Sequence, residues 1–103
     1  MNFANRFVGK NFIVTGGSSG IGRALALELN SLGAKVTTIA RRADKLADLQ
    51  SAASGRFPIQ TIIGDVTDEK CLKDLVKAAS KHGTINFVVH NAGTSMQIGR
   101  AHV

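Results

Sequence analysis

A glycine-rich run between a strand-like segment and a helix-like segment constrains the fold of this chain most. The run covers residues 15–22 and has the sequence Thr-Gly-Gly-Ser-Ser-Gly-Ile-Gly. Between a strand and a helix, Gly16 permits a tight turn, Gly20 lets the backbone approach a pyrophosphate, and Gly22 allows close helix packing. Backbone N–H groups and the positive end of the helix dipole would then face an anion. The run therefore predicts a phosphate-binding loop.

The rest of the chain alternates between short strand-like segments and longer amphipathic ones. Strands are predicted at residues 11–14, 35–40, 58–63 and 85–90, and helices at 23–32, 43–53 and 68–82. This alternation predicts an α/β fold with a parallel sheet and right-handed crossovers. With the glycine loop after the first strand, we expect the strand order 3-2-1-4, the first part of a doubly wound fold.

Apolar residues at helical spacing indicate which side of each helix should be buried. The predicted stripes are Ile21, Leu25, Leu29 and Leu32; Leu46, Leu49 and Ala53; and Leu72, Leu75, Val76 and Ala79. Gly33 is expected to end the first helix, and Thr67 is expected to cap the start of the third.

The motif Thr-Gly-x-x-x-Gly-x-Gly resembles the cofactor loop of the short-chain dehydrogenase/reductase family. Two further segments fit that family in order and distance: Asp65-Val66, and His-Asn-Ala-Gly at residues 90–93, a variant of the family's Asn-Asn-Ala-Gly. The resemblance covers approximately residues 7–95. It implies a Rossmann-like doubly wound sheet, with the N-terminal, NAD(P)-binding part at residues 1–97.

The resemblance also implies which residues contact a nicotinamide dinucleotide. They are Gly16, Ser18, Ser19, Gly20, Ile21, Gly22, Arg41, Arg42, Asp65, Val66, Asn91, Ala92 and Gly93. Asp65 would accept a hydrogen bond from the adenine amino group, and it could also form an Asx turn. Thr15 would tie the glycine loop to the Asn91 turn, and His90 is expected to be a scaffold residue rather than a catalytic base.

The end of the second predicted strand discriminates between the two nicotinamide cofactors. An acidic residue there binds the ribose hydroxyls of NAD, whereas an arginine favours a 2′-phosphate. Residues 39–42 are Ile-Ala-Arg-Arg, and the next carboxylate is Asp44. Arg41 can make charge-assisted hydrogen bonds to a phosphate, so NADP(H) is favoured over NAD(H). Arg42 either adds to the positive field or is solvated, and Arg41 could instead be a surface charge.

The residues that carry catalysis in this family are missing from the chain. Family members reduce carbonyls with a Tyr-x-x-x-Lys pair and a serine, the tyrosine protonating the developing alkoxide. This sequence contains no tyrosine and ends shortly after the fourth predicted strand. We therefore expect an NADP(H)-dependent oxidoreductase acting on a carbonyl or alcohol substrate, present here as an inactive fragment without catalytic residues.

The last six residues, 98–103, break the family pattern after Gln97. Ile-Gly-Arg-Ala-His-Val is what the start of a sequencing adapter encodes in one reading frame. We expect this segment to be a non-native tail and the natural protein to continue beyond Gln97. The alternative is a genuine C-terminus of this composition.

Composition argues against several other partners. The formal charge of +6 suits nucleic acid, but the cations are scattered and there is no Tyr or Trp to stack bases. No apolar run is long enough to span a membrane, and residues 1–7 lack the apolar core of a signal peptide. The single cysteine, Cys71, suits a reducing compartment. We expect a cytoplasmic protein without a metal site, with a small-molecule substrate, homo-oligomeric at full length.

Two other functions fit parts of the sequence. A non-catalytic dinucleotide-binding or regulatory fragment would need no catalytic residues at all. A methyltransferase with the same fold would need an acidic residue after the second strand, where this chain has Arg41.

Overall fold

Four parallel strands form one sheet in a computed structural model, which describes residues 6–18 and 20–91. The strands are β1 (Asn11–Thr15), β2 (Lys35–Ala40), β3 (Gln60–Ile63) and β4 (Phe87–His90). Their spatial order is β3-β2-β1-β4, which confirms the predicted order 3-2-1-4. Because all four strands are parallel, their carboxyl ends lie along the same edge of the sheet.

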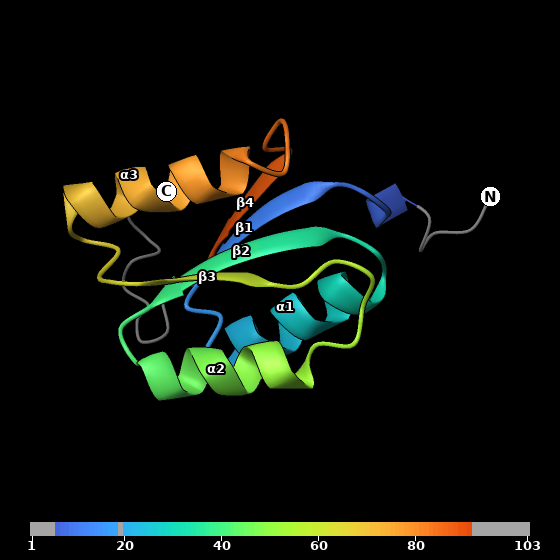
Figure 1. Cartoon of the computed structure of the whole chain (residues 1–103), viewed down its shortest axis with the longest axis horizontal. Helices are drawn as coiled ribbons and strands as arrows, with labels where there is room; N and C mark the ends of the chain where they lie inside the picture. Colours follow the sequence, from blue (N-terminus) through green and yellow to red (C-terminus); the bar gives the residue numbers. More distant parts are fainter. Residues whose placement is uncertain (1–5, 19, 92–103) are drawn as a thin grey trace.

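Within the described residues, three helices cover the two faces of this sheet. The helices α1 (Gly20–Ser31) and α2 (Ala43–Ala52) lie on one face, and α3 (Glu69–Ser80) lies on the other (Figure 1). All five residues of β1 are buried, as expected for a strand covered on both sides. Alternate residues of β1 serve the two faces: Phe12 and Val14 pack with Leu29 and Leu49, whereas Ile13 packs with Leu75.

The helix ends agree with the sequence in one case and not in another. Gly33 has a φ of +89°, and its N–H donates to the Asn30 carbonyl at 3.0 Å, so it ends α1 as predicted. The prediction that Thr67 caps α3 is wrong. Asp68 is the cap, and its carboxylate accepts a hydrogen bond from the Lys70 N–H at 2.9 Å. The Thr67 hydroxyl instead donates to Asp65 Oδ1 at 2.7 Å.

Two strands begin later than the sequence suggests. The first pair between β3 and β2 joins Gln60 to Thr37, because Pro58 has no N–H to donate to the ladder. The strand β4 begins only at Phe87, since Asn86 uses its side chain in place of a backbone carbonyl. Asn86 Oδ1 accepts from the Asn11 N–H at 2.8 Å, while the Asn86 N–H donates to the Asn11 carbonyl at 2.9 Å.

Three members of the predicted apolar stripes are exposed. Ile21, in the first turn of α1, is 80% exposed, and Leu72 and Val76 of α3 are 39% and 49% exposed. Leu75 and Ala79 occupy the side of α3 that packs against the sheet, which leaves Leu72 and Val76 on an adjacent side.

Among the helices of residues 6–18 and 20–91, none is both long and apolar enough to cross a membrane.

Candidate functional site

A cleft of about 530 Å³ opens at the edge of the sheet where the four strands end. Open α/β sheets bind ligands at this edge, because the loops that follow the strands meet there. The cleft is lined by Gly16, Ser18, Ile39, Ala40, Arg41, Arg42, Gly64, Asp65, Val66, Thr67, His90 and Asn91.

The glycine loop beside the cleft is closely packed at Gly16, Gly17 and Gly22 and open at Gly20. A Cβ on Gly22 would lie 2.2 Å from the Gly16 carbonyl oxygen, and one on Gly16 would lie 2.7 Å from the Asn91 carbonyl oxygen. Gly22 therefore packs against the turn at Gly16 rather than directly on the sheet. Gly20 has a φ of +58°, and among the described residues no atom outside its chain neighbours and its own helix lies within 4 Å of its Cβ position, so the backbone there is accessible to a ligand.

Thr15 joins the glycine loop to the end of β4. Its hydroxyl oxygen accepts a hydrogen bond from the Asn91 N–H at 3.0 Å and lies 3.0 Å from His90 Nδ1. The Asn91 side chain reaches back to the Gly16 carbonyl at 3.4 Å. These contacts confirm the predicted link between Thr15 and the Asn91 turn. They engage His90 Nδ1 with Thr15, in keeping with a scaffold role.

Sequence reasoning missed a second support for the loop, between Thr38 and Gly17. The Gly17 N–H donates to Thr38 Oγ1 at 3.1 Å, and the Thr38 hydroxyl donates to the Val14 carbonyl. A Cβ on Gly17 would lie 2.5 Å from Thr38 Oγ1, so this contact requires glycine. The sequence did contain a signal for this contact: Thr38 lies within a strand, and a hydroxyl buried in a strand needs a hydrogen-bond partner.

The rim of the cleft carries two arginine–carboxylate pairs. Arg41 Nη1 lies 3.9 Å from Asp65 Oδ2, and Arg42 Nη2 lies 2.9 Å from Asp44 Oδ2. Hydrogen bonds from the Thr67 N–H and hydroxyl hold the pKa of Asp65 below its ordinary value, and Arg41 acts in the same direction. The hydrogen bond from Arg42 likewise lowers the pKa of Asp44. Both carboxylates are therefore ionised at neutral pH.

The cleft brings together most of the residues predicted to hold a dinucleotide. Those that line it are Gly16, Ser18, Arg41, Arg42, Asp65, Val66 and Asn91. Gly20, Ile21 and Gly22 form the first residues of α1. Ser19, Ala92 and Gly93 lie outside the described residues. Within residues 6–18 and 20–91, no group of three or more His, Cys, Asp and Glu side chains is arranged to hold a metal ion.

Known proteins match this chain in sequence and in structure. The family model described as short chain dehydrogenase matches residues 10–102. A glucose 1-dehydrogenase of Gluconobacter oxydans is 40% identical over 96 residues, which cover 88% of this chain and 35% of that protein. A very-long-chain 3-oxoacyl-CoA reductase of Bos taurus is 37% identical over 93 residues, or 88% of this chain and 30% of the relative.

Solved structures of dehydrogenases have a similar fold. The crystal structure of an apo-form glucose dehydrogenase of Caenorhabditis elegans matches with a TM-score of 0.79 and 32% identity, over 93% of this chain and 43% of that one. The chain spans about a third of the length of these two curated relatives. The family model covers most of the chain, and the sheet has the strand order expected from the resemblance. The chain therefore belongs to the short-chain dehydrogenase family, whose members are oxidoreductases that bind nicotinamide dinucleotides.

Proposed function

We propose that residues 1–97 are the dinucleotide-binding part of an NADP(H)-dependent oxidoreductase that interconverts a carbonyl and an alcohol. The observation that carries this proposal is a single cleft, at the carboxyl edge of the sheet, that joins the glycine loop to Arg41 and Asp65. In the same proposal, residues 98–103 are a non-native tail.

The residues of the cleft fit the two ends of the adenosine half of such a cofactor. At the pyrophosphate end, the open space over Gly20 allows a phosphate to approach the backbone. At the adenine end, the ionised carboxylate of Asp65 can accept a hydrogen bond from the adenine amino group. Bound NADP(H) would supply the hydride donor or acceptor.

Arg41 is the residue that favours NADP(H) over NAD(H) in this proposal. Its side chain is 79% exposed, and its contact with Asp65 is long, at 3.9 Å. The guanidinium can therefore turn to a 2′-phosphate at low cost and bind it with charge-assisted hydrogen bonds. Small Ala40, at the end of β2, leaves space beside it.

Proton transfer to the substrate requires a group that this sequence does not supply. The chain has no tyrosine, so we place the catalytic tyrosine and lysine in a part of the natural protein beyond Gln97. The proposed substrate is a small molecule with a carbonyl or hydroxyl group.

Titration of the natural protein with NADPH and NADH tests the cofactor assignment. We expect NADPH to bind more tightly, and we expect the 103-residue chain alone to oxidise no NADPH in the presence of ketones or aldehydes. Tighter binding of NADH would overturn the assignment. Turnover by the chain alone, in protein free of host reductases, would overturn the location of the catalytic residues.

The missing tyrosine also favours a second candidate, a non-catalytic dinucleotide-binding or regulatory protein. The genomic locus separates the two proposals. A coding sequence that continues into a Tyr-x-x-x-Lys segment supports the enzyme, whereas a stop codon directly after an encoded Val103 supports the non-catalytic protein.

A further inference from the structure

Two adjacent arginines at the rim of the cleft each pair with an aspartate, but the two pairs differ in the number and length of their contacts. Arg42 makes two hydrogen bonds to the Asp44 carboxylate, from Nη2 to Oδ2 at 2.9 Å and from Nε to Oδ1 at 3.3 Å. Arg41 makes one ionic contact of 3.9 Å with Asp65. A guanidinium bound at two points is more strongly oriented than one with a single long contact. Arg42 is therefore the more restrained of the two cations.

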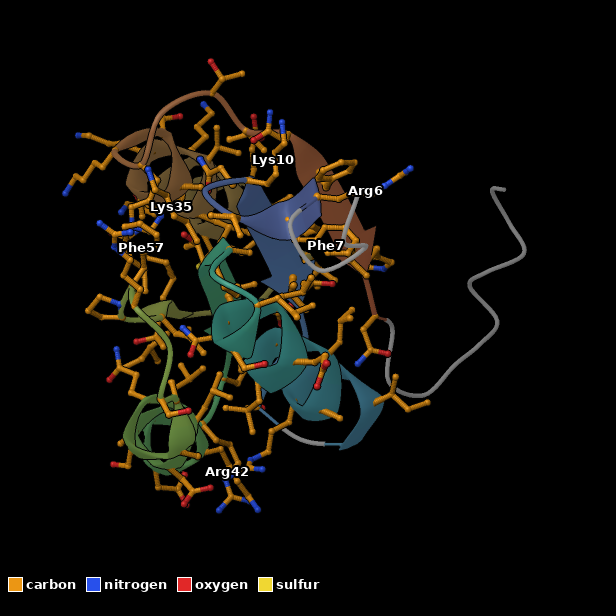
Figure 2. The ribbon with its side chains drawn as sticks, turned by 90° about the vertical axis from the view of Figure 1, so that its right-hand side faces the viewer. Arg6, Phe7, Lys10, Lys35, Arg42 and Phe57 are labelled. Atoms are coloured by element: carbon orange, nitrogen blue, oxygen red, sulfur yellow. The ribbon has the colours of Figure 1, made fainter. Side chains whose placement is uncertain are left out.

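The backbone holds Asp44 in position to bind Arg42. Arg42 is the N-cap residue of α2, and its carbonyl accepts a hydrogen bond from the Leu46 N–H at 3.2 Å. Leu46 is buried, which fixes the first turn of the helix against the rest of the protein. Asp44 lies in that turn, where a carboxylate also interacts favourably with the helix dipole. Figure 2 shows Arg42 at the bottom of the view near α2, away from Lys35 and Phe57.

We propose that Asp44 is a specificity-determining residue, which keeps Arg42 from the 2′-phosphate and so limits the preference of the cleft for NADP(H). The inference rests on the proposed function, because it assumes that the 2′-phosphate binds beside Arg41. Asp44 acts in two ways: it competes with the phosphate for the Arg42 guanidinium, and its own negative charge repels the phosphate.

Removal of the Asp44 charge should release Arg42 and strengthen binding of a 2′-phosphate. The Arg42 and Asp44 side chains are each 66% exposed, so solvent screens their interaction. Exposed pairs contribute about 0.2–1 kcal/mol, which corresponds to an increase in affinity of up to about fivefold. Binding of an adenosine ligand without a 2′-phosphate should change little.

The test is calorimetric titration of the natural full-length protein and its variants with 2′,5′-ADP and with 5′-AMP. In Asp44→Asn, we expect 2′,5′-ADP to bind about two to five times more tightly than in the wild type and 5′-AMP to bind with unchanged affinity. Asp44→Ser is a second variant that keeps a small polar residue in the first turn of α2, should the asparagine perturb folding. Circular dichroism of each variant checks that the helices are intact.

Two controls separate release of Arg42 from a general loss of negative charge. In an Arg42→Ala background, Asp44→Asn should strengthen binding of 2′,5′-ADP less than it does when Arg42 is present, because only the direct repulsion between Asp44 and the phosphate is then removed. Asp48→Asn removes another carboxylate of α2, one that pairs with Arg23 at 3.1 Å, and it should leave the ratio of the two affinities unchanged. The same gain with and without Arg42, or from Asp48→Asn, would overturn the proposal.

The wild-type protein distinguishes failure of this inference from failure of the proposed function. If the wild type prefers 2′,5′-ADP to 5′-AMP and neither Asp44 variant increases that preference, the inference is wrong and the NADP(H) assignment stands. If the wild type prefers 5′-AMP, the NADP(H) assignment is wrong, and the role of Asp44 fails with it.

Discussion

The Thr15 hydroxyl accepts a hydrogen bond from the backbone N–H of Asn91, which lies 76 positions later in the chain, at 3.0 Å. Thr15 is the last residue of β1, and Asn91 directly follows β4. The bond therefore ties together the ends of two adjacent parallel strands, beside the glycine turn. It positions the loop at the base of the cleft.

Loss of this hydroxyl should destabilise the fold. Thr15→Val keeps the size of the buried side chain but leaves the Asn91 N–H without its acceptor, which costs about 1–3 kcal/mol of unfolding free energy. Urea denaturation of the natural protein measures the loss. Thr15→Ser keeps the hydroxyl and serves as the control. A Thr15→Val protein with the same unfolding free energy as the wild type would show that the hydrogen bond does not contribute to stability.

Arg41 should affect the binding of one cofactor and not the other. Arg41→Ala removes a charge-assisted contact with the 2′-phosphate and should weaken NADPH binding by roughly 1.5–3 kcal/mol, with NADH affinity nearly unchanged. Fluorescence titration of both cofactors measures the difference. Arg42→Ala is the matched control and should cost less, because Asp44 already holds Arg42. Equal weakening of both cofactors would show that Arg41 does not bind the phosphate.

Gly20 and Gly22 should respond differently to substitution. Gly22→Ala places a Cβ 2.2 Å from a backbone oxygen, so we expect it to destabilise the fold by about 1–3 kcal/mol. Gly20→Val places its side chain in open space at a φ of +58°, so it should abolish dinucleotide binding while the sheet still forms. Gly20→Ala is the control for the backbone strain, about 1–2 kcal/mol.

Thermal unfolding and cofactor titration of the three glycine variants distinguish these effects. A Gly20→Val protein that binds NADPH like the Gly20→Ala control would mean that the cofactor does not approach this part of the loop. A Gly22→Ala protein as stable as the wild type would mean that the turn at Gly16 can move to accept a methyl group.

His82 should make the stability of the protein depend on pH. Partial burial, together with the nearby charge of Lys35, lowers the pKa of His82 below its ordinary value of 6.5. The folded state therefore binds fewer protons than the unfolded state when the pH falls below 6.5. The corresponding stability is fully present above pH 6.5, and it is lost as the pH falls towards the lower pKa of the folded state.

Urea denaturation between pH 7 and about pH 5 measures this dependence, since Asp and Glu side chains titrate mainly below that range. His82→Gln should flatten the profile. A wild-type profile that is equally flat in this range would contradict the assignment to His82.

The exposed edge of the sheet should limit the solubility of the 103-residue chain. In the described residues, β4 pairs only with β1, and its Val88 side chain is 64% exposed. Unprotected edge strands promote association with other chains. We expect the chain alone to aggregate and Val88→Lys to reduce the aggregation, as measured by light scattering. Thr61→Lys, on β3 at the opposite edge of the sheet, is the control and should have a smaller effect.

The order of the elements along the chain and the order of the strands in the sheet followed from the sequence. Apolar periodicity and turn residues act over a few positions, so they predicted the alternation of strands and helices correctly. Gly16, Arg41, Asp65 and Asn91 were each predicted to follow a strand, and because the carboxyl ends of parallel strands share an edge, all four line one cleft in the structure. The glycine motif also identified the family, because its spacing reflects the local backbone geometry of one turn.

Apart from the link between Thr15 and Asn91, which was predicted, only the tertiary structure decided which partner each of these polar side chains binds. Sequence position suggested that Thr67 is the N-cap of α3. In the structure, Asp65 accepts a hydrogen bond from the Thr67 hydroxyl, and Asp68 is the N-cap. Thr38 supports Gly17 across two strands, a pairing set by sheet register over 21 positions. Asp44 forms its hydrogen bonds with Arg42 and not with the neighbouring Arg41. These choices depend on side-chain directions and distances of a few ångströms, which residue type and spacing do not specify.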